Sequence, residues 1–239
     1  MYALKLASCK KILGRKTVFS GLSAELEGFV LGIAGANGSG KSTLVKCLVG
    51  LLSLDEGFAE IRRAGEVGRD PEIITLTRGT FGVSAPWMNA YPELSVMENM
   101  AFLESLSGFS GRLGRLWQPG RLGQPGKPGQ IKRTNPQEKT PSSFSSGIAP
   151  HITFGLSEED LTKPVGSLSS GQQQKARLIL AGAFDPEVLF LDEPDSHMDE
   201  TSIEHLHAWI VERQKQSKLT IMASNQPREL ALCDGVLTL

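Results

Sequence analysis

The stretch GANGSGKST, residues 35–43, constrains this chain more than any other part of its sequence. A short apolar run, residues 29–34, precedes it and is typical of a buried strand. The residues after it carry apolar side chains at helical spacing. Strand, glycine loop and helix therefore follow one another, which is the context that the P-loop pattern G-x-x-x-x-G-K-S/T requires. The sequence predicts a phosphate-binding loop in an α/β fold.

The residue types of this loop suit a triphosphate ligand. Gly35, Gly38 and Gly40 permit backbone dihedrals that bring N–H groups close to phosphate oxygens. The helix that begins near Lys41 turns its positive dipole end toward the anion. We expect Lys41 to reach the β- and γ-phosphates and the Ser42 hydroxyl to ligate Mg²⁺. The alternative is a glycine-rich turn that binds nothing, but every fixed position is filled and the flanks fit. The expected nucleotide-binding residues are Gly35, Ala36, Asn37, Gly38, Ser39, Gly40, Lys41, Ser42 and Thr43.

Length and composition bound the fold and the partners. A chain of 239 residues is one large domain, or one domain with a subdomain. A net charge of −1 gives no reason to expect a nucleic-acid partner. Cys9, Cys47 and Cys233 match no metal or disulfide spacing, which favours reduced thiols in a cytoplasmic protein. No apolar run approaches the roughly 20 residues that span a bilayer, so we expect another chain to supply any membrane part.

Strand and helix patterns alternate along the chain. Residues 2–8 are expected to form an amphipathic strand, residues 17–26 a second strand, and residues 58–62 an edge strand. Residues 94–106 place apolar side chains at helical spacing. Since strands alternate with helices through the rest of the chain, we expect a mainly parallel sheet with antiparallel strands at its edge.

Residues 108–150 differ in composition from the rest. They are rich in glycine and proline, offer little that could form a core, and hold seven Lys or Arg against a single Glu. We interpret this segment as a flexible, basic surface insertion. The alternative is contact with an anionic membrane surface or an acidic partner, for which the lone Trp117 could serve as an interfacial anchor.

Two acids end a second apolar strand. The run VLFLDEP, residues 188–194, carries Asp192 and Glu193 directly after its buried part. Ligands of open α/β sheets gather at the carboxyl ends of the strands. We expect Asp192 to hold Mg²⁺ beside Ser42, and Glu193 to orient and deprotonate an attacking water. Paired acids after a strand are common, so this interpretation depends on the glycine loop upstream.

With these two elements, a third makes the chain resemble the nucleotide-binding subunits of ABC transporters. The third element is LSSGQ, residues 168–172, which alone would suggest only a polar helix cap. The stretches that match the family are residues 35–43 (Walker A), 92–99 (the start of a helical subdomain), 168–172 (signature), 189–193 (Walker B) and 196–199 (D-loop). The resemblance implies a P-loop NTPase fold of the RecA-like kind. It implies one ABC ATPase domain over residues 1–239, with a helical subdomain over about 95–171.

The resemblance also implies a mechanism. In the family, two such domains pack head to tail, and each ATP lies between one P-loop and the signature of the partner. Ser169, Gly171 and Gln172 would then bind the nucleotide of the other copy. The implied partners are a second copy or paired ATPase subunit, and a separate integral-membrane permease. The implied place is the cytoplasm, on the inner face of the cell membrane, where ATP hydrolysis is coupled to transport.

Three positions depart from the family pattern. Pro86 aligns where the family usually has a Gln, and a Pro side chain cannot donate a hydrogen bond. Asn225 replaces the usual catalytic His that contacts the γ-phosphate, and it can donate a hydrogen bond but carry no charge. Leu13 lies where an aromatic ring usually stacks on adenine, so base selectivity is expected to be loose. With Lys41 and Glu193 intact, we expect slow but real ATP hydrolysis.

Alternative functions remain open at this point. One is a soluble ABC ATPase in an assembly process, such as iron–sulphur cluster assembly or cytochrome maturation. Another is a nucleotide-dependent interaction module that hardly hydrolyses. Residues 223–227, ASNQP, are similar to the THQP stretch of the cytochrome c maturation (haem-exporter) ATPases, although the His is replaced.

Overall fold

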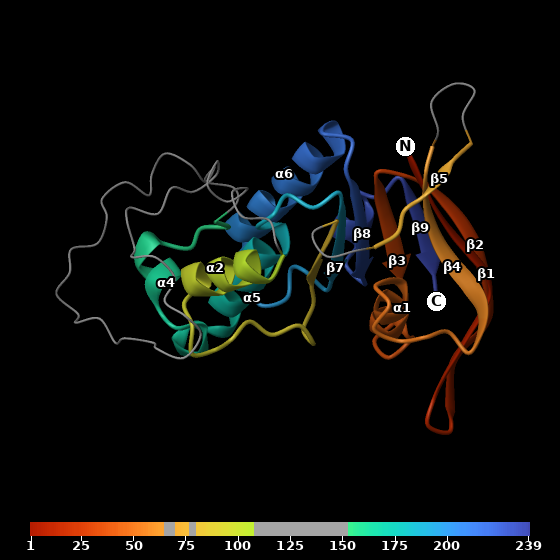
Figure 1. Ribbon diagram of the computed structural model, residues 1–239, viewed down its shortest axis with the longest axis horizontal. Coiled ribbons are helices and arrows are strands. Elements are labelled where there is room, and N and C mark those ends of the chain that lie inside the picture. The colour runs from red at the N-terminus through yellow and green to blue at the C-terminus, as the bar shows by residue number, and fades with distance from the viewer. Residues whose placement is uncertain (65–69, 77–79, 108–152) are drawn as a thin grey trace.

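Two β-sheets lie side by side, with helices between and beside them (Figure 1). The computed structural model describes residues 1–64, 70–76, 80–107 and 153–239. The insertion expected at 108–150, including Trp117, lies outside these ranges. The predicted α/β fold with a parallel sheet and antiparallel strands is confirmed.

The parallel sheet has the strand order β6-β7-β8-β3-β9. Its strands are β3 (Val30–Ala34), β6 (Phe81–Ser84), β7 (Val188–Asp192), β8 (Leu219–Ser224) and β9 (Gly235–Thr238). All neighbouring pairs are parallel. Every residue of β3, β7 and β8 is buried. The continuous apolar runs predicted for the central strands therefore fit a sheet that is covered on both faces.

The antiparallel sheet has the order β2-β1-β4-β5. Its strands are β1 (Tyr2–Leu13), β2 (Lys16–Gly28), β4 (Glu56–Arg63) and β5 (Glu72–Ile73). The edge strand predicted at 58–62 is wrong as an edge, because β4 pairs with β1 on one side and β5 on the other. Only Arg62 and Arg63 pair with β5, a contact too short to leave a periodic signal.

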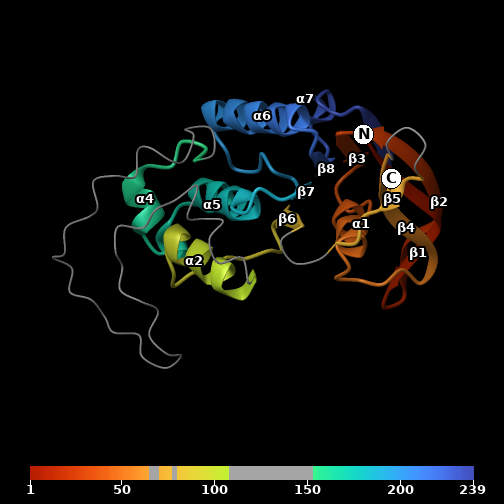
Figure 2. The same ribbon diagram turned by 45° about the horizontal axis from the view of Figure 1, so that its top comes forward.

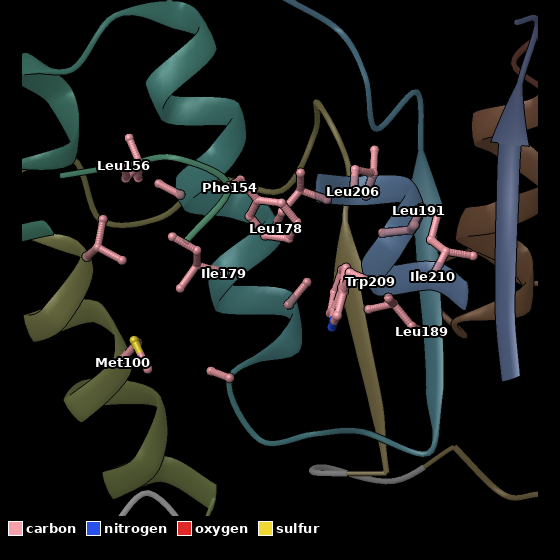
Figure 3. Close-up of a cluster of buried hydrophobic side chains, with 14 of the residues drawn as sticks. Met100, Phe154, Leu156, Leu178, Ile179, Leu189, Leu191, Leu206, Trp209 and Ile210 are labelled. Carbon is pink, nitrogen blue, oxygen red and sulfur yellow. The ribbon is translucent and has the colours of Figure 1, made fainter. Parts of the chain in front are cut away.

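The parallel sheet separates two hydrophobic cores. Along β7, Leu189 and Leu191 face one core, while Val188 and Phe190 face the other, as the two-residue period of a strand requires. The first core packs the sheet against helices α2 (Val96–Ser107), α5 (Ser170–Gly182) and α6 (Glu200–Lys215), as Figure 3 shows. The second core packs it against α1 (Lys41–Leu48) and the antiparallel sheet.

Short polar sequences begin the helices of the first core. Ser157 and Asp160 form a capping box at the start of α4 (Glu158–Thr162). Ser95 caps α2 by accepting a hydrogen bond from the Glu98 N–H at 3.1 Å.

A 3₁₀ turn, Val165–Ser167, precedes α5, and α7 (Pro227–Leu230) follows β8 on the side of α6 (Figure 2). No helix in the described ranges is both long and apolar enough to cross a membrane.

The contact between α5 and β6 leaves no room for a side chain at Gly82. A Cβ atom added there would lie 2.0 Å from the carbonyl oxygen of Ala181, in the last turn of α5. We expect Gly82→Ala to push α5 away from the sheet and to lower the free energy of unfolding by about 3 kcal/mol, as overpacking does. Urea unfolding measures this change.

Gly235 provides a matched control in another strand of the same sheet. A Cβ atom there would meet Leu26 at an ordinary contact distance of 3.5 Å. Gly235→Ala is therefore expected to change the stability by less than about 1 kcal/mol. Equal effects of the two substitutions would contradict the tight helix–strand contact.

Candidate nucleotide-binding site

Four neighbouring strands deliver the candidate site residues to one edge of the parallel sheet. The register pairs Ala34 with Ser224, Ala223 with Asp192, and Leu191 with Ser84, so β3, β8, β7 and β6 end almost level. The glycine loop follows β3, and Asn225 follows β8. Asp192 and Glu193 lie at the end of β7, and Trp87 comes three residues after the end of β6. The carboxyl ends of parallel strands are where ligands of such sheets bind.

The glycine loop has a backbone that other residues could not adopt. Gly35 and Gly40 have φ angles of 150° and 111°. A Cβ atom at Gly35 would lie 2.5 Å from the Ser39 hydroxyl oxygen, and one at Gly40 would lie 2.7 Å from a methyl carbon of Val18. Both conformation and space therefore demand glycine. The Leu44 N–H donates to the Gly40 carbonyl at 2.8 Å, which starts α1 at the end of the loop.

Lys41 is held within this loop. Its side chain is 4% exposed, and its ammonium donates to the carbonyl oxygens of Gly35 at 2.8 Å and Ala36 at 3.3 Å. The first turn of α1 carries no acidic residue, so nothing on it competes for the positive end of the helix dipole. A buried ammonium above a helix N-terminus creates a place for anionic oxygens.

One cavity joins the loop to the second acid. Its volume is about 290 Å³, and Glu193 lines it together with Gly38, Lys41 and Ser42. The complete lining is Leu13, Lys16, Val18, Gly38, Gly40, Lys41, Ser42, Thr43 and Glu193. Leu13, for which the sequence predicts contact with the base, is among these lining residues. Lys16 and Val18 come from β2, and no local pattern had singled them out.

Asp192 is buried with one oxygen engaged and the other free. Its side chain is fully buried, and its Oδ2 accepts a hydrogen bond from the indole N–H of Trp87 at 2.9 Å. Its Oδ1 is buried too and finds no hydrogen-bond donor among the described residues. A carboxylate oxygen without a donor, on the residue before the cavity-lining Glu193, fits a hard divalent cation such as Mg²⁺. Glu193 follows with φ of 49°, a strained value for a residue with a side chain.

Asn225 contacts the glycine loop from β8. Its amide nitrogen donates to the side-chain oxygen of Asn37 at 3.1 Å, and Asn225 is exposed. The residue expected at the family's histidine position therefore lies beside the loop. Directly before it, the Ser224 hydroxyl donates to the buried Glu229 carboxylate and accepts from the Gln226 N–H at 2.9 Å.

The signature residues are ordered but lie away from this cavity. Ser169 caps α5, where its hydroxyl accepts from the Gln172 N–H at 3.3 Å and its own N–H donates to the Gln172 side chain at 2.9 Å. A Cβ atom at Gly171 would lie 2.5 Å from the carbonyl oxygen of His197, so this glycine packs tightly on residues 196–199. Helix α5 belongs to the first core and α1 to the second, on opposite faces of the sheet (Figures 1 and 2).

The structure thus brings together most of the predicted site. The loop at 35–43, Asp192, Glu193 and Asn225 meet at one edge, while Ser169, Gly171 and Gln172 do not reach it within one chain. Such a glycine loop and acid pair on a parallel sheet define a P-loop nucleotide-binding domain.

Comparisons with known proteins give the family. The family model described as "ABC transporter" matches residues 21–196. The chain belongs to this family, as the sequence motifs predicted. It is 29% identical over 235 residues to the ribose import ATP-binding protein RbsA of Bacillus licheniformis, covering 98% of this chain and 42% of that protein. It is 28% identical over 198 residues to the Nod factor export ATP-binding protein I of Paraburkholderia xenovorans, covering 82% and 54% of the two chains.

This chain therefore spans about half the length of these two relatives. Among solved structures, the dimeric structure of MJ0796, a bacterial ABC transporter cassette, matches with a TM-score of 0.69 at 17% identity. The match covers 99% of this chain and 94% of that chain. A likeness at this identity establishes the fold, and the predicted P-loop fold class is thereby confirmed.

The buried carboxyl of Glu229 generates a prediction about pH. Burial raises the pKa of this group from its ordinary 4.5 to about 7. The folded state then binds this proton more tightly than the unfolded chain, so its stabilising contribution is complete below about pH 4.5 and is lost as the pH rises to about 7. Glu229→Gln removes that loss. We compare the free energy of unfolding of the variant with that of the original chain at each pH. We expect this difference to change in favour of the variant by about 3 kcal/mol between pH 4.5 and pH 8.

Urea unfolding at several pH values from 4.5 to 8 measures the difference. Glu204→Gln, on the exposed face of α6, is the matched control, and it should shift stability by a similar small amount at every pH. A flat difference for Glu229→Gln would show that its carboxyl is not held protonated by burial.

Proposed function

We propose that this chain binds and hydrolyses Mg-ATP as the nucleotide-binding domain of an ABC transporter. One observation carries the proposal: the glycine loop, Lys41 and Glu193 line a single cavity. A phosphate cradle and a carboxylate that can activate water are the two parts that hydrolysis of a phosphoanhydride needs. The confirmed family membership supports this assignment.

Each residue of the site has a role in this proposal. Residues 35–43 cradle the phosphates with their backbone N–H groups, and Lys41 exchanges its carbonyl partners for the β- and γ-phosphate oxygens. Ser42 and the free oxygen of Asp192 would hold Mg²⁺, which neutralises charge on the phosphates when it is bound. Glu193 accepts the proton of the attacking water. Leu13 and Val18 offer the base an apolar contact without an aromatic ring.

The signature residues argue for a pair of domains. Ser169, Gly171 and Gln172 are fixed by α5 and residues 196–199, on the face of the sheet opposite to α1. A second copy, or a paired ATPase subunit, must therefore bring its own signature to this P-loop. The dimeric form of the MJ0796 cassette supports such an arrangement. In a symmetric pair each chain gives its signature to the other, which creates two equal sites.

The partner that uses this cycle is proposed to be a separate membrane permease. The chain would then lie in the cytoplasm, at the inner face of the membrane, through that partner. Relatives with import and export in their names share the nucleotide-binding part. The proposal therefore concerns the ATP cycle common to them and assigns no cargo. The described segments at 95–107 and 153–171 are proposed to form the helical subdomain of one ABC ATPase domain.

Substitution of Glu193 tests hydrolysis separately from binding. Glu193→Gln keeps a side chain of the same size but cannot take a proton, so we expect turnover to fall at least about a hundredfold. ATP binding should survive, and the paired form should accumulate under Mg-ATP because its ATP is no longer removed. Phosphate release and light scattering after size exclusion measure both effects. Lys41→Ala is the binding control and should weaken ATP affinity about tenfold or more. Equal turnover in the original chain and Glu193→Gln would refute the proposed ATPase.

The amide at Asn225 predicts a slow enzyme. An imidazole at this position could carry a proton near the phosphate, whereas the amide cannot. We expect Asn225→His to raise turnover about tenfold, a modest share of what acid–base groups contribute. Asn225→Gln keeps an amide and is the matched control, which should not accelerate the reaction. Turnover in the His variant no faster than in the Gln variant would remove Asn225 as the cause of slow hydrolysis.

A further inference from the structure

Trp87 lies between the glycine-loop helix and the acidic end of β7. It follows β6 in a short turn, which the Met88 N–H closes by donating to the Ala85 carbonyl at 3.0 Å. The side chain is half-buried and packs against the second core. None of the sequence motifs includes Trp87. Its neighbour, the exposed Pro86, is the residue that aligns with the Gln of the family pattern.

The indole makes two polar contacts with different elements. Its N–H donates to Asp192 Oδ2 at 2.9 Å, across 105 positions of sequence. The Lys46 ammonium of α1 lies 5.1 Å from the centre of its ring, within the range of a cation–π contact. Trp87 thus connects the helix that follows the glycine loop to the acid of β7.

The contact with Trp87 leaves the two carboxylate oxygens of Asp192 in different environments. Oδ2 is fixed by the indole, so rotation of this buried carboxylate would break a charge-assisted hydrogen bond. Oδ1 is left without a donor among the described residues. A neutral N–H that orients a carboxylate and leaves one oxygen open matches the outer-shell groups that surround metal ligands in proteins.

We propose that Trp87 is a positioning residue for the divalent cation of the nucleotide, because its indole N–H holds Asp192 with Oδ1 available to that cation. The inference rests on the proposed function, since it concerns the same site. Trp87 itself touches neither the nucleotide nor the cation; it acts through Asp192.

Two substitutions separate this role from simple core filling. Trp87→Phe keeps a flat aromatic ring against Lys46 and the core but removes the N–H. Trp87→Gln loses the ring, yet its amide nitrogen lies as many bonds from Cβ as the indole nitrogen and can donate to Asp192. A positioning role predicts that Gln preserves the cation site better than Phe, whereas core filling predicts the reverse.

Calorimetric titration with a non-hydrolysable ATP analogue, in excess Mg²⁺ and in EDTA, provides the measurement. The ratio of the two affinities reports what the cation adds. We expect this ratio to fall about tenfold in Trp87→Phe, as for other outer-shell groups, with the affinity in EDTA unchanged. Trp87→Gln should recover most of the ratio. A ratio for Trp87→Phe equal to that of the original chain would overturn the inference while leaving the proposed function standing. Absence of nucleotide binding in the original chain would overturn both.

A measurement on the original chain covers the case in which Trp87→Phe does not fold. The chain has three tryptophans, so a ¹⁵N-labelled sample gives three indole N–H signals, which Trp117→Phe and Trp209→Phe assign by elimination. Mn²⁺ added to the nucleotide complex should broaden the Trp87 signal selectively, and Mg²⁺ should shift it. A Trp87 signal that ignores both ions would overturn the inference.

Discussion

The level ends of four parallel strands are the constraint on which the rest of this structure depends. Because β3, β8, β7 and β6 pair in one parallel register, side chains far apart in sequence leave the sheet at the same edge. A shift of one residue in any strand would turn its side chains to the other face. The two packed cores oppose such a shift, since Leu189 and Leu191 would exchange cores with Val188 and Phe190.

Burial at this edge then decides the chemistry of the ionisable groups. Lys41, Asp192 and Glu229 are almost fully buried, and each is held by a partner from the nearby backbone or side chains. A charge in such a place is costly unless it is paired. Lys41 donates hydrogen bonds to carbonyl oxygens of the loop, and Asp192 accepts one from the indole N–H of Trp87. Burial raises the pKa of the Glu229 carboxyl to about 7. Asp192 keeps one oxygen without a donor among the described residues, which fits the cation proposed for this site.

The sequence predicted those parts of the site that local patterns encode. The glycine loop and the acids at the end of β7 occupy consecutive residues, and the helix cap at Ser169 lies three residues before Gln172, so local spacing identifies them. Trp87 could not be found this way, because its partner is 105 positions away and depends on which strands are neighbours. Lys16 and Val18 could not be found this way either, because β2 belongs to the antiparallel sheet and only the packing of the two sheets brings it to the glycine loop. The pairing of β4 with β5 was missed for another reason, because it involves only two residues of each strand.

The close contact at Gly171 links the edge that carries Glu193 to the face that would meet a second chain in the proposed pair. Three residues, 194–196, separate Glu193 from His197, whose carbonyl oxygen leaves no space for a side chain at Gly171. In the proposed pair, a displacement of Glu193 would reach the signature loop through these few residues. In the proposed pair, that loop faces the nucleotide of the other chain. Loss of a phosphate at one site would thus alter how tightly the nucleotide at the other site is bound. The two sites of the proposed pair would then be coupled in one cycle.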